Sequence, residues 1–155
     1  MTESSKPKRR RPSAKTVRQA ASPRQQADGH RQEREDHRLA LVHDYVQVIA
    51  DLIDQENEAR VVDIAARFGV SHVTALKNVE RLQRKGLADT KPRRAVFLTD
   101  AGWKLVRRLR HRYDIVVRFL MSLGISADAA HADAEGIEHH VSDETLDAFE
   151  RRIES

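Results

Sequence analysis

The stretch that most constrains the fold is VVDIAARFGVSHVTALKNVERLQRKGL, residues 61–87. Apolar spacing up to Phe68 predicts a short helix, and Gly69 stands where a helix ends in a left-handed residue. Ser71 is a good N-cap for a second, longer helix that Gly86 closes. Two helices joined by a tight turn are typical of a helix-turn-helix, and two ordinary packed helices are the alternative. The second helix carries, among other polar residues, Lys77, Asn78, Arg81 and Arg84.

The next stretch, LADTKPRRAVFLTDAG at residues 87–102, predicts a β-hairpin. A hairpin that directly follows a helix-turn-helix makes a winged helix, which argues against two ordinary helices. The turn of the hairpin carries Lys91, Arg93 and Arg94, and these positive charges suit a phosphate backbone.

Helices are predicted on both sides of this unit. A long helix starts near Glu33, and its apolar residues recur at three- and four-residue spacing up to a polar DQENEAR run. After the hairpin, Thr99 or Asp100 caps a helix of about 101–123, which has more apolar surface than one small domain needs, so part of it is expected to face a partner subunit. Ser126 and Ser142 each cap a further helix.

Composition excludes several classes of protein. Because the chain has no cysteine, it has no disulfide, thiolate metal site, iron–sulfur cluster or cysteine nucleophile. No apolar run approaches the roughly 18 residues of a membrane span. The basic N-terminus lacks the apolar segment of a signal peptide, so we expect a cytoplasmic protein without membrane contact.

Charge is concentrated at the N-terminus. Residues 1–24 hold eight Lys or Arg against the single acid Glu3, a net charge of +7. Since the whole chain carries +4, the remainder carries −3. The stretch has no periodicity and is predicted to be a disordered basic arm. It either contacts a polyanion or is a solvated tail.

The segment DAEGIEHHVSDETLDAF, residues 133–149, concentrates acidic and imidazole groups. On a helix, Glu135, Glu138 and His139 share one face, whereas His140 points elsewhere. Two carboxylates and one imidazole suit Mn²⁺, Fe²⁺ or Zn²⁺. From the spacing alone, however, a charged face exposed to solvent is favoured. No HExxH motif, glycine-rich phosphate loop or GxSxG motif is present, so a hydrolase is not expected.

Several segments together resemble the manganese-regulator branch of the diphtheria-toxin-repressor family. They are HDYVQVIADLI, VVDIAARFGVS, RRAVFLTDAG and the specific AEGIEHHVS, and the similarity covers roughly residues 36–152. The resemblance implies a homodimeric, metal-dependent repressor that is mainly α. It implies a winged helix-turn-helix DNA-binding domain over 33–99, after an arm over 1–32, and a helical metal-binding and dimerisation domain over 100–155.

The resemblance also implies a ligand set, which this chain matches in part. Four of six family ligands are present, namely Asp44, Glu135, Glu138 and His139. Gln47 replaces a glutamate and Tyr113 replaces a histidine. An amide offers no charge and a phenol is a poor ligand, so we expect weaker metal binding. His43 and His111, near these positions in sequence, are not expected to compensate.

We therefore predict a Mn²⁺-responsive repressor of manganese-uptake genes that binds double-stranded operator DNA as a homodimer, with Fe²⁺ or Zn²⁺ as other possible ions. Ser71, His72, Thr74 and Lys77 are expected to face DNA, and Arg93 and Arg94 to hold phosphates. Leu76 and Asn78 do not fit one inside–outside pattern. The alternatives are a metal-independent regulator with a decayed site and, less in keeping with the sequence, a metalloenzyme that uses Glu135 and Glu138 as acid and base.

Overall fold

The computed structural model describes residues 22–91 and 95–155. The chain divides into two units, residues 1–34 and 35–155. Helix α1 (Pro23–Glu56) begins in the first unit. It starts ten residues earlier than the expected Glu33, inside the stretch predicted to be disordered. Residues 1–21 of the predicted arm lie outside the described part of the chain.

The early start of α1 has a local cause. The Ser22 amide donates to Oε1 of Gln25 at 2.8 Å, and the Gln25 amide donates to the Ser22 hydroxyl at 3.3 Å. This reciprocal pair is a capping box, and proline is favoured in the first position of a helix. Apolar periodicity is absent here, so a prediction based on periodicity missed the helix.

The predicted helix-turn-helix and hairpin are present. Helices α2 (Val61–Phe68) and α3 (His72–Arg84) flank Gly69, which has a φ of 62°, and the Ser71 hydroxyl accepts a hydrogen bond from the Thr74 amide. Strands β2 (Ala88–Lys91) and β3 (Ala95–Leu98) pair antiparallel. The predicted phosphate contacts Arg93 and Arg94 lie outside the described residues.

A third strand was not predicted. Strand β1 (Ala59–Arg60) pairs antiparallel with β3, which gives a sheet with the order β1-β3-β2. Its two residues lie in the polar run that follows α1, where no alternation marks a strand. Ala59 is nonetheless buried, so the pairing closes the core beside α2.

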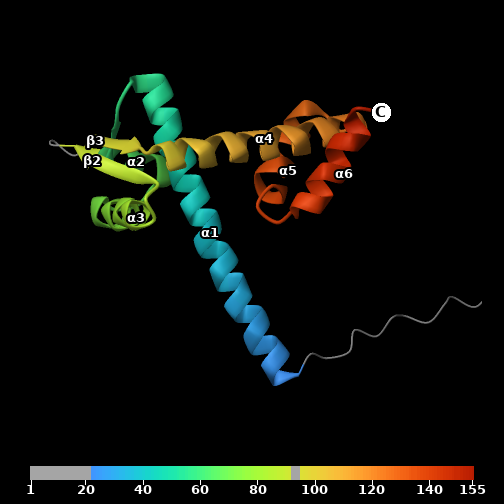
Figure 1. Ribbon diagram of the computed structural model, residues 1–155, viewed down its shortest axis with the longest axis horizontal. Coiled ribbons are helices and arrows are strands. Elements are labelled where there is room, and N and C mark those ends of the chain that lie inside the picture. Colours follow the sequence, from blue (N-terminus) through green and yellow to red (C-terminus); the bar gives the residue numbers. More distant parts are fainter. Residues whose placement is uncertain (1–21, 92–94) are drawn as a thin grey trace, which may run out of the picture. The chain divides into compact units, whose positions relative to one another are not determined.

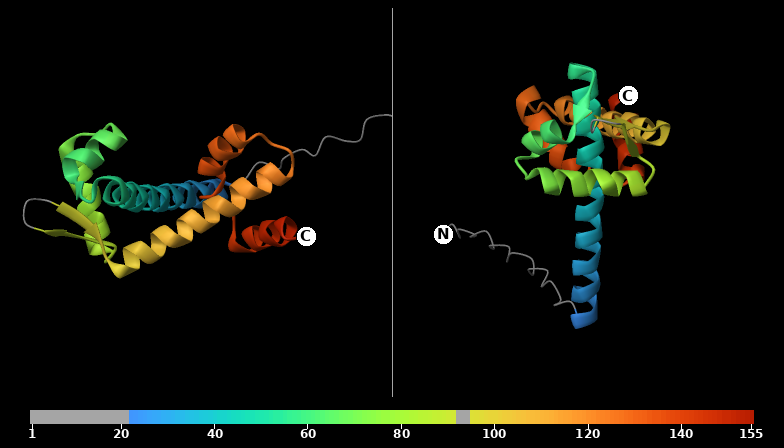
Figure 2. Two further views of the ribbon diagram at one scale, coloured as in Figure 1. Left: turned by 90° about the horizontal axis from the view of Figure 1, so that it is seen from above. Right: turned by 90° about the vertical axis from the view of Figure 1, so that its left-hand side faces the viewer.

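Three helices complete the chain: α4 (Asp100–Ser122), α5 (Ala127–Ile137) and α6 (Asp143–Ile153). Thr99, Ser126 and Ser142 cap them, as predicted. Within residues 35–155, α4 leads from the hairpin to the two C-terminal helices (Figure 1) and passes between α5 and α6 (Figure 2). Helix α5 ends at Ile137, so Glu138 and His139 lie in the turn that follows it and not on the predicted helix.

Two hydrophobic cores lie along α4. Val106 and Leu109 of α4 pack into the first core with residues of α1, α2, α3 and the sheet. Ile115 and Val116 pack into the second core with α5 and α6. The apolar excess of α4 therefore fills two cores, while Met121 and Leu123 at its end remain exposed. None of the described helices has the length and apolar character needed to cross a membrane.

Candidate metal site

One pocket collects all six positions that the resemblance singled out. Its volume is about 640 Å³. Asp44 and Gln47 enter it from α1, and Tyr113 enters it from α4. Residues of α5 and the turn after it complete the set, namely Glu135, Glu138 and His139.

Three of these side chains are in direct contact. Nε2 of His139 lies 3.4 Å from Oδ1 of Asp44 and 3.6 Å from Oε1 of Glu138. Glu138 is 4% exposed, and among the described residues it is the one charged residue that is buried. Glu135 lines the same pocket but is exposed. It takes no part in the two ion pairs that His139 forms with Asp44 and Glu138. The structure thus joins α1 to the turn after α5 through Asp44 and His139.

The buried carboxylate of Glu138 and the half-buried carboxylate of Asp44 are short of positive charge. Burial raises the pKa of Glu138, against the opposing effects of His139, Gln47 and Arg112, and Asp44 raises it further. Burial also raises the pKa of Asp44, with His139 opposing. Within the described residues, Oε2 of Glu138 and Nδ1 of His139 are buried without a hydrogen-bond partner. An unpartnered buried carboxylate oxygen is costly, and a cation in the pocket would relieve that cost.

Arg112 fixes the turn that carries Glu138 and His139. Its guanidinium donates to Oδ1 of Asp143 at 2.6 Å and to the carbonyl oxygens of Glu138 at 2.9 Å and Val141 at 2.6 Å. The planar fork of an arginine suits several acceptors at once. Arg112 could not be identified from local sequence, because its partners lie 26 to 31 residues away in the chain.

Gln47 and Tyr113, the two departures from the pattern that the resemblance implies, both have side-chain partners. The Gln47 side chain hydrogen-bonds to Glu138 and lowers its pKa. The Tyr113 hydroxyl lies 2.8 Å from Nδ1 of His131. Burial and the charges of Glu135 and Glu138 raise the pKa of Tyr113, so its phenol keeps its proton. His131 was likewise not among the predicted site residues, and its one signal in the sequence is its position one helical turn before Glu135.

The two nearby histidines behave differently. His111 lies 3.6 Å from Glu150, outside the pocket, as expected. His43 stacks on His139 with ring centroids 5.8 Å apart. Burial, His139, Arg108 and Arg112 lower the pKa of His43 to about 4. A neutral imidazole therefore supports His139 from the side that does not line the pocket.

The candidate ligands suit a divalent cation, although their side chains do not converge on a single point. Residues 22–91 and 95–155 hold no three His, Asp or Glu side chains that converge into a complete ion site. The set nevertheless contains three carboxylates and an imidazole, which suit Mn²⁺, Fe²⁺ or Zn²⁺. The orphaned Glu138 oxygen and the raised pKa values of Asp44 and Glu138 fit such an ion.

The predicted DNA-facing residues lie at the start of α3. Thr74 and Lys77 are exposed and His72 is half-buried. The Ser71 hydroxyl is engaged in capping the helix. Asn78 is the residue that reverses the expected pattern, because its amide donates to the Tyr45 hydroxyl at 3.1 Å, and Leu76 packs against the core.

Comparison with known proteins agrees with this arrangement. The sequence profile of the "Iron dependent repressor, N-terminal DNA binding domain" matches residues 40–96, and that of the "Iron dependent repressor, metal binding and dimerisation domain" matches residues 99–155. The chain is 51% identical to the transcriptional regulator MntR of Escherichia coli O157:H7 over 138 residues, which cover 89% of each chain. The chain belongs to the MntR group of the iron-dependent repressor family. Family members are transcriptional regulators and not enzymes, which confirms that prediction.

Further relatives agree. An HTH-type transcriptional regulator MntR of Geobacillus kaustophilus is 32% identical over 124 residues, covering 74% of this chain and 88% of that protein. A solved manganese-dependent transcriptional repressor in complex with manganese is 32% identical, with a TM-score of 0.62. The match covers 72% of this chain and about half, 52%, of that one. The predicted fold class, a winged helix-turn-helix followed by a helical metal-binding and dimerisation domain, is confirmed.

Proposed function

We propose that this chain is a manganese-responsive repressor that binds operator DNA as a homodimer and controls manganese-uptake genes. One observation carries the proposal: Asp44 of α1 meets Glu138 and His139 of the turn after α5 in one pocket. Helix α1 packs into the same core as the helix-turn-helix. The ligands thus come from both parts of the regulator, and Fe²⁺ or Zn²⁺ would fit the same donors.

The residues give a simple basis for the response. Burial, and to a smaller extent the charge of Asp44, raises the pKa of Glu138, so the ionised carboxylate of Glu138 is disfavoured in the metal-free pocket. A bound divalent cation would supply the positive charge that the group lacks. Asp44, Glu138 and His139 would then favour one placement of α1 relative to the C-terminal helices. Coupling of this kind is typically about 1–3 kcal/mol.

The DNA-binding part of the proposal follows the helix-turn-helix. Ser71, His72, Thr74 and Lys77 would face the major groove, with Ser71 chiefly capping the helix, and Arg93 and Arg94 would hold phosphates. The proposed division is an arm over 1–32, a DNA-binding domain over 33–99 and a metal-binding and dimerisation domain over 100–155. A regulator of this kind would act on DNA in the cytoplasm.

Operator binding with and without Mn²⁺ tests the proposal. Promoter fragments of manganese-uptake genes are titrated with the wild type and with Glu138→Ala, and anisotropy reports binding. Metal should tighten wild-type binding by about 5- to 150-fold, and Glu138→Ala should abolish this gain. Equal affinity in all four measurements would instead identify a metal-independent regulator. Gln47 and Tyr113 are the residues that favour this second candidate.

A further inference from the structure

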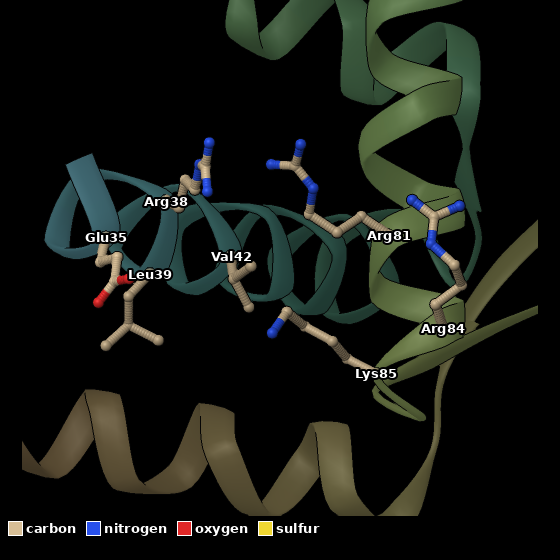
Figure 3. A pocket seen from close by; sticks show the side chains of 7 residues that line it. All are labelled: Glu35, Arg38, Leu39, Val42, Arg81, Arg84 and Lys85. Carbon is tan, nitrogen blue, oxygen red and sulfur yellow. The ribbon is translucent and has the colours of Figure 1, made fainter. Parts of the chain in front are cut away.

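A second hollow, of about 560 Å³, lies where α1 passes the C-terminal end of α3. In Figure 3, Arg38 reaches into this region from α1, while Arg81 and Lys85 extend toward α1 from α3. The lining of this basic hollow comprises Glu35, Arg38, Leu39, Val42, Arg81, Arg84 and Lys85. Four cations and one acid therefore share a small space.

The four cations contrast with arginines elsewhere in the described chain that are paired with acidic residues. Arg60, Arg67, Arg110, Arg112 and Arg118 each form an ion pair with an acidic residue. In the described part of the chain, the side chains that line the basic hollow form no ion pair or side-chain hydrogen bond with one another or with their neighbours. Four cations that share the hollow with the single acid Glu35 repel each other, so they favour a polyanion as their partner.

Neutralisation of the α3 helix dipole is the simpler explanation for part of the group. Arg81 lies in the last turn of α3, as does Arg84, and Lys85 is the C-cap. Cations there stabilise a helix C-terminus by themselves. Arg38 has no such role, because it lies inside α1, far from the end of that helix at Glu56. Its presence in the hollow requires another reason.

We propose that the basic hollow binds the phosphate backbone of the DNA on which α3 is seated. This inference rests on the proposed operator binding and adds a contact to it. Phosphate oxygens beside the major groove would meet the guanidinium groups of Arg38, Arg81 and Arg84. Such contacts fix the position of a protein on DNA and carry no sequence information. The hollow would therefore strengthen binding to operator and unrelated DNA alike.

The salt dependence of DNA binding tests the inference. The variants are Arg38→Gln and the pair Arg81→Gln/Arg84→Gln, each measured on a promoter fragment and on unrelated DNA across a series of salt concentrations. The logarithm of the binding constant falls linearly with the logarithm of the salt concentration. Each lost phosphate contact makes this negative slope shallower by about 0.9. In a homodimer with both hollows on DNA, the slope should become shallower by about 1.8 for Arg38→Gln. For Arg81→Gln/Arg84→Gln the change in slope should be about twice as large.

A matched control is available on α6. Arg151 and Arg152 lie in the last turn of that helix and are exposed. Arg151→Gln/Arg152→Gln thus makes the same change in net charge, also at a helix C-terminus. Its slope should equal that of the wild type. Arg81→Lys/Arg84→Lys keeps both charges and should also keep the wild-type slope, whereas a general loss of fold would change it.

Three outcomes would overturn the inference. The first is a slope for Arg38→Gln and for the α3 pair that matches the α6 control. The second is a loss confined to the promoter fragment, since phosphate contacts act on all DNA. The third is saturable binding of inorganic phosphate that Arg38→Gln removes while the DNA slope stays unchanged, which would identify a small-anion site. Failure of the wild type to prefer the promoter fragment would count against the proposed function only, because unrelated DNA still tests the hollow.

Discussion

The Tyr113 hydroxyl lies 2.8 Å from Nδ1 of His131, and the two rings stack with centroids 5.9 Å apart. This pair joins α4 to α5 one helical turn before Glu135. It holds a phenol at the pocket position where the resemblance to the repressor family implies an imidazole. Because the pKa of Tyr113 is raised, the phenol is neutral and contributes little to metal binding.

Tyr113→His is therefore expected to tighten Mn²⁺ binding. It adds an imidazole to a pocket that already holds Glu135 and Glu138. We expect a gain of about tenfold, or ~1.4 kcal/mol, in calorimetric titration of the dimer. Tyr113→Phe is the control, since it breaks the hydrogen bond to His131 without adding a ligand, and its affinity should stay near that of the wild type. An equal gain in both variants would mean that Tyr113 acts by obstruction.

Glu138→Gln should affect metal-free and metal-bound protein in opposite directions. Burial raises the pKa of Glu138, so its contribution to stability is lost as pH rises through the folded-state pKa, above which the ionised group costs stability. Removing that charge should raise the metal-free unfolding free energy by about 1 kcal/mol. The same change should abolish the rise in Tm that Mn²⁺ causes in the wild type.

Thermal unfolding with and without Mn²⁺ measures both effects of Glu138→Gln. Glu80, which is exposed inside α3 and away from the ends of that helix, offers a control in Glu80→Gln, which should leave both values unchanged. A metal-free Glu138→Gln protein that is less stable than the wild type would show that the carboxylate is satisfied in the folded chain.

Structural features that depend on a few neighbouring residues could be predicted from the sequence. Features that depend on contacts between distant residues could not. Gly69 and Ser71 mark the turn of the helix-turn-helix through their own backbone and side-chain chemistry, so this unit was predicted correctly. The capping box at Ser22 was equally local but lay in a polar stretch where only apolar periodicity was considered. Strand β1 depends on pairing with β3, which no local pattern encodes.

The candidate site divides in the same way. Glu135, Glu138 and His139 are close in sequence, and their link to Asp44 came from a resemblance to a family and not from spacing. Arg112 and His131 act on the pocket through contacts with residues 18 to 31 positions away. Nothing in the sequence distinguishes Arg112 from the other arginines of α4, and His131 stands in α5 among alanines and acidic residues without a pattern that marks it.

Arg112→Lys should destabilise the turn that carries the candidate ligands. A lysine cannot serve Asp143, the Glu138 carbonyl and the Val141 carbonyl at once, so partly buried carbonyl acceptors lose their donor. We expect a loss of about 2 kcal/mol in urea unfolding, and weaker Mn²⁺ binding in titration. Arg108→Lys is the control, because Arg108 forms a 3.7 Å exposed pair with the same Asp143. That change should cost no more than about 0.5 kcal/mol, and equal losses would refute a role for the fork of Arg112.

His43 should make the metal-free protein sensitive to mild acid. Its pKa falls from 6.5 to about 4 on folding, because of burial, His139, Arg108 and Arg112. Between these values the unfolded chain takes up a proton that the folded chain does not, so stability present above pH 6.5 is lost as pH falls toward 4. The ring is half-buried, so solvent screening limits the loss to about 1 kcal/mol. Urea unfolding at pH 7 and pH 5 measures the decrease in unfolding free energy. This decrease should be smaller for His43→Gln than for the wild type. His140→Gln, a change at an exposed position, should show the same decrease as the wild type. If His43→Gln and the wild type lose equal stability, the imidazole of His43 is protonated in the folded protein and stacks on His139 as a cation.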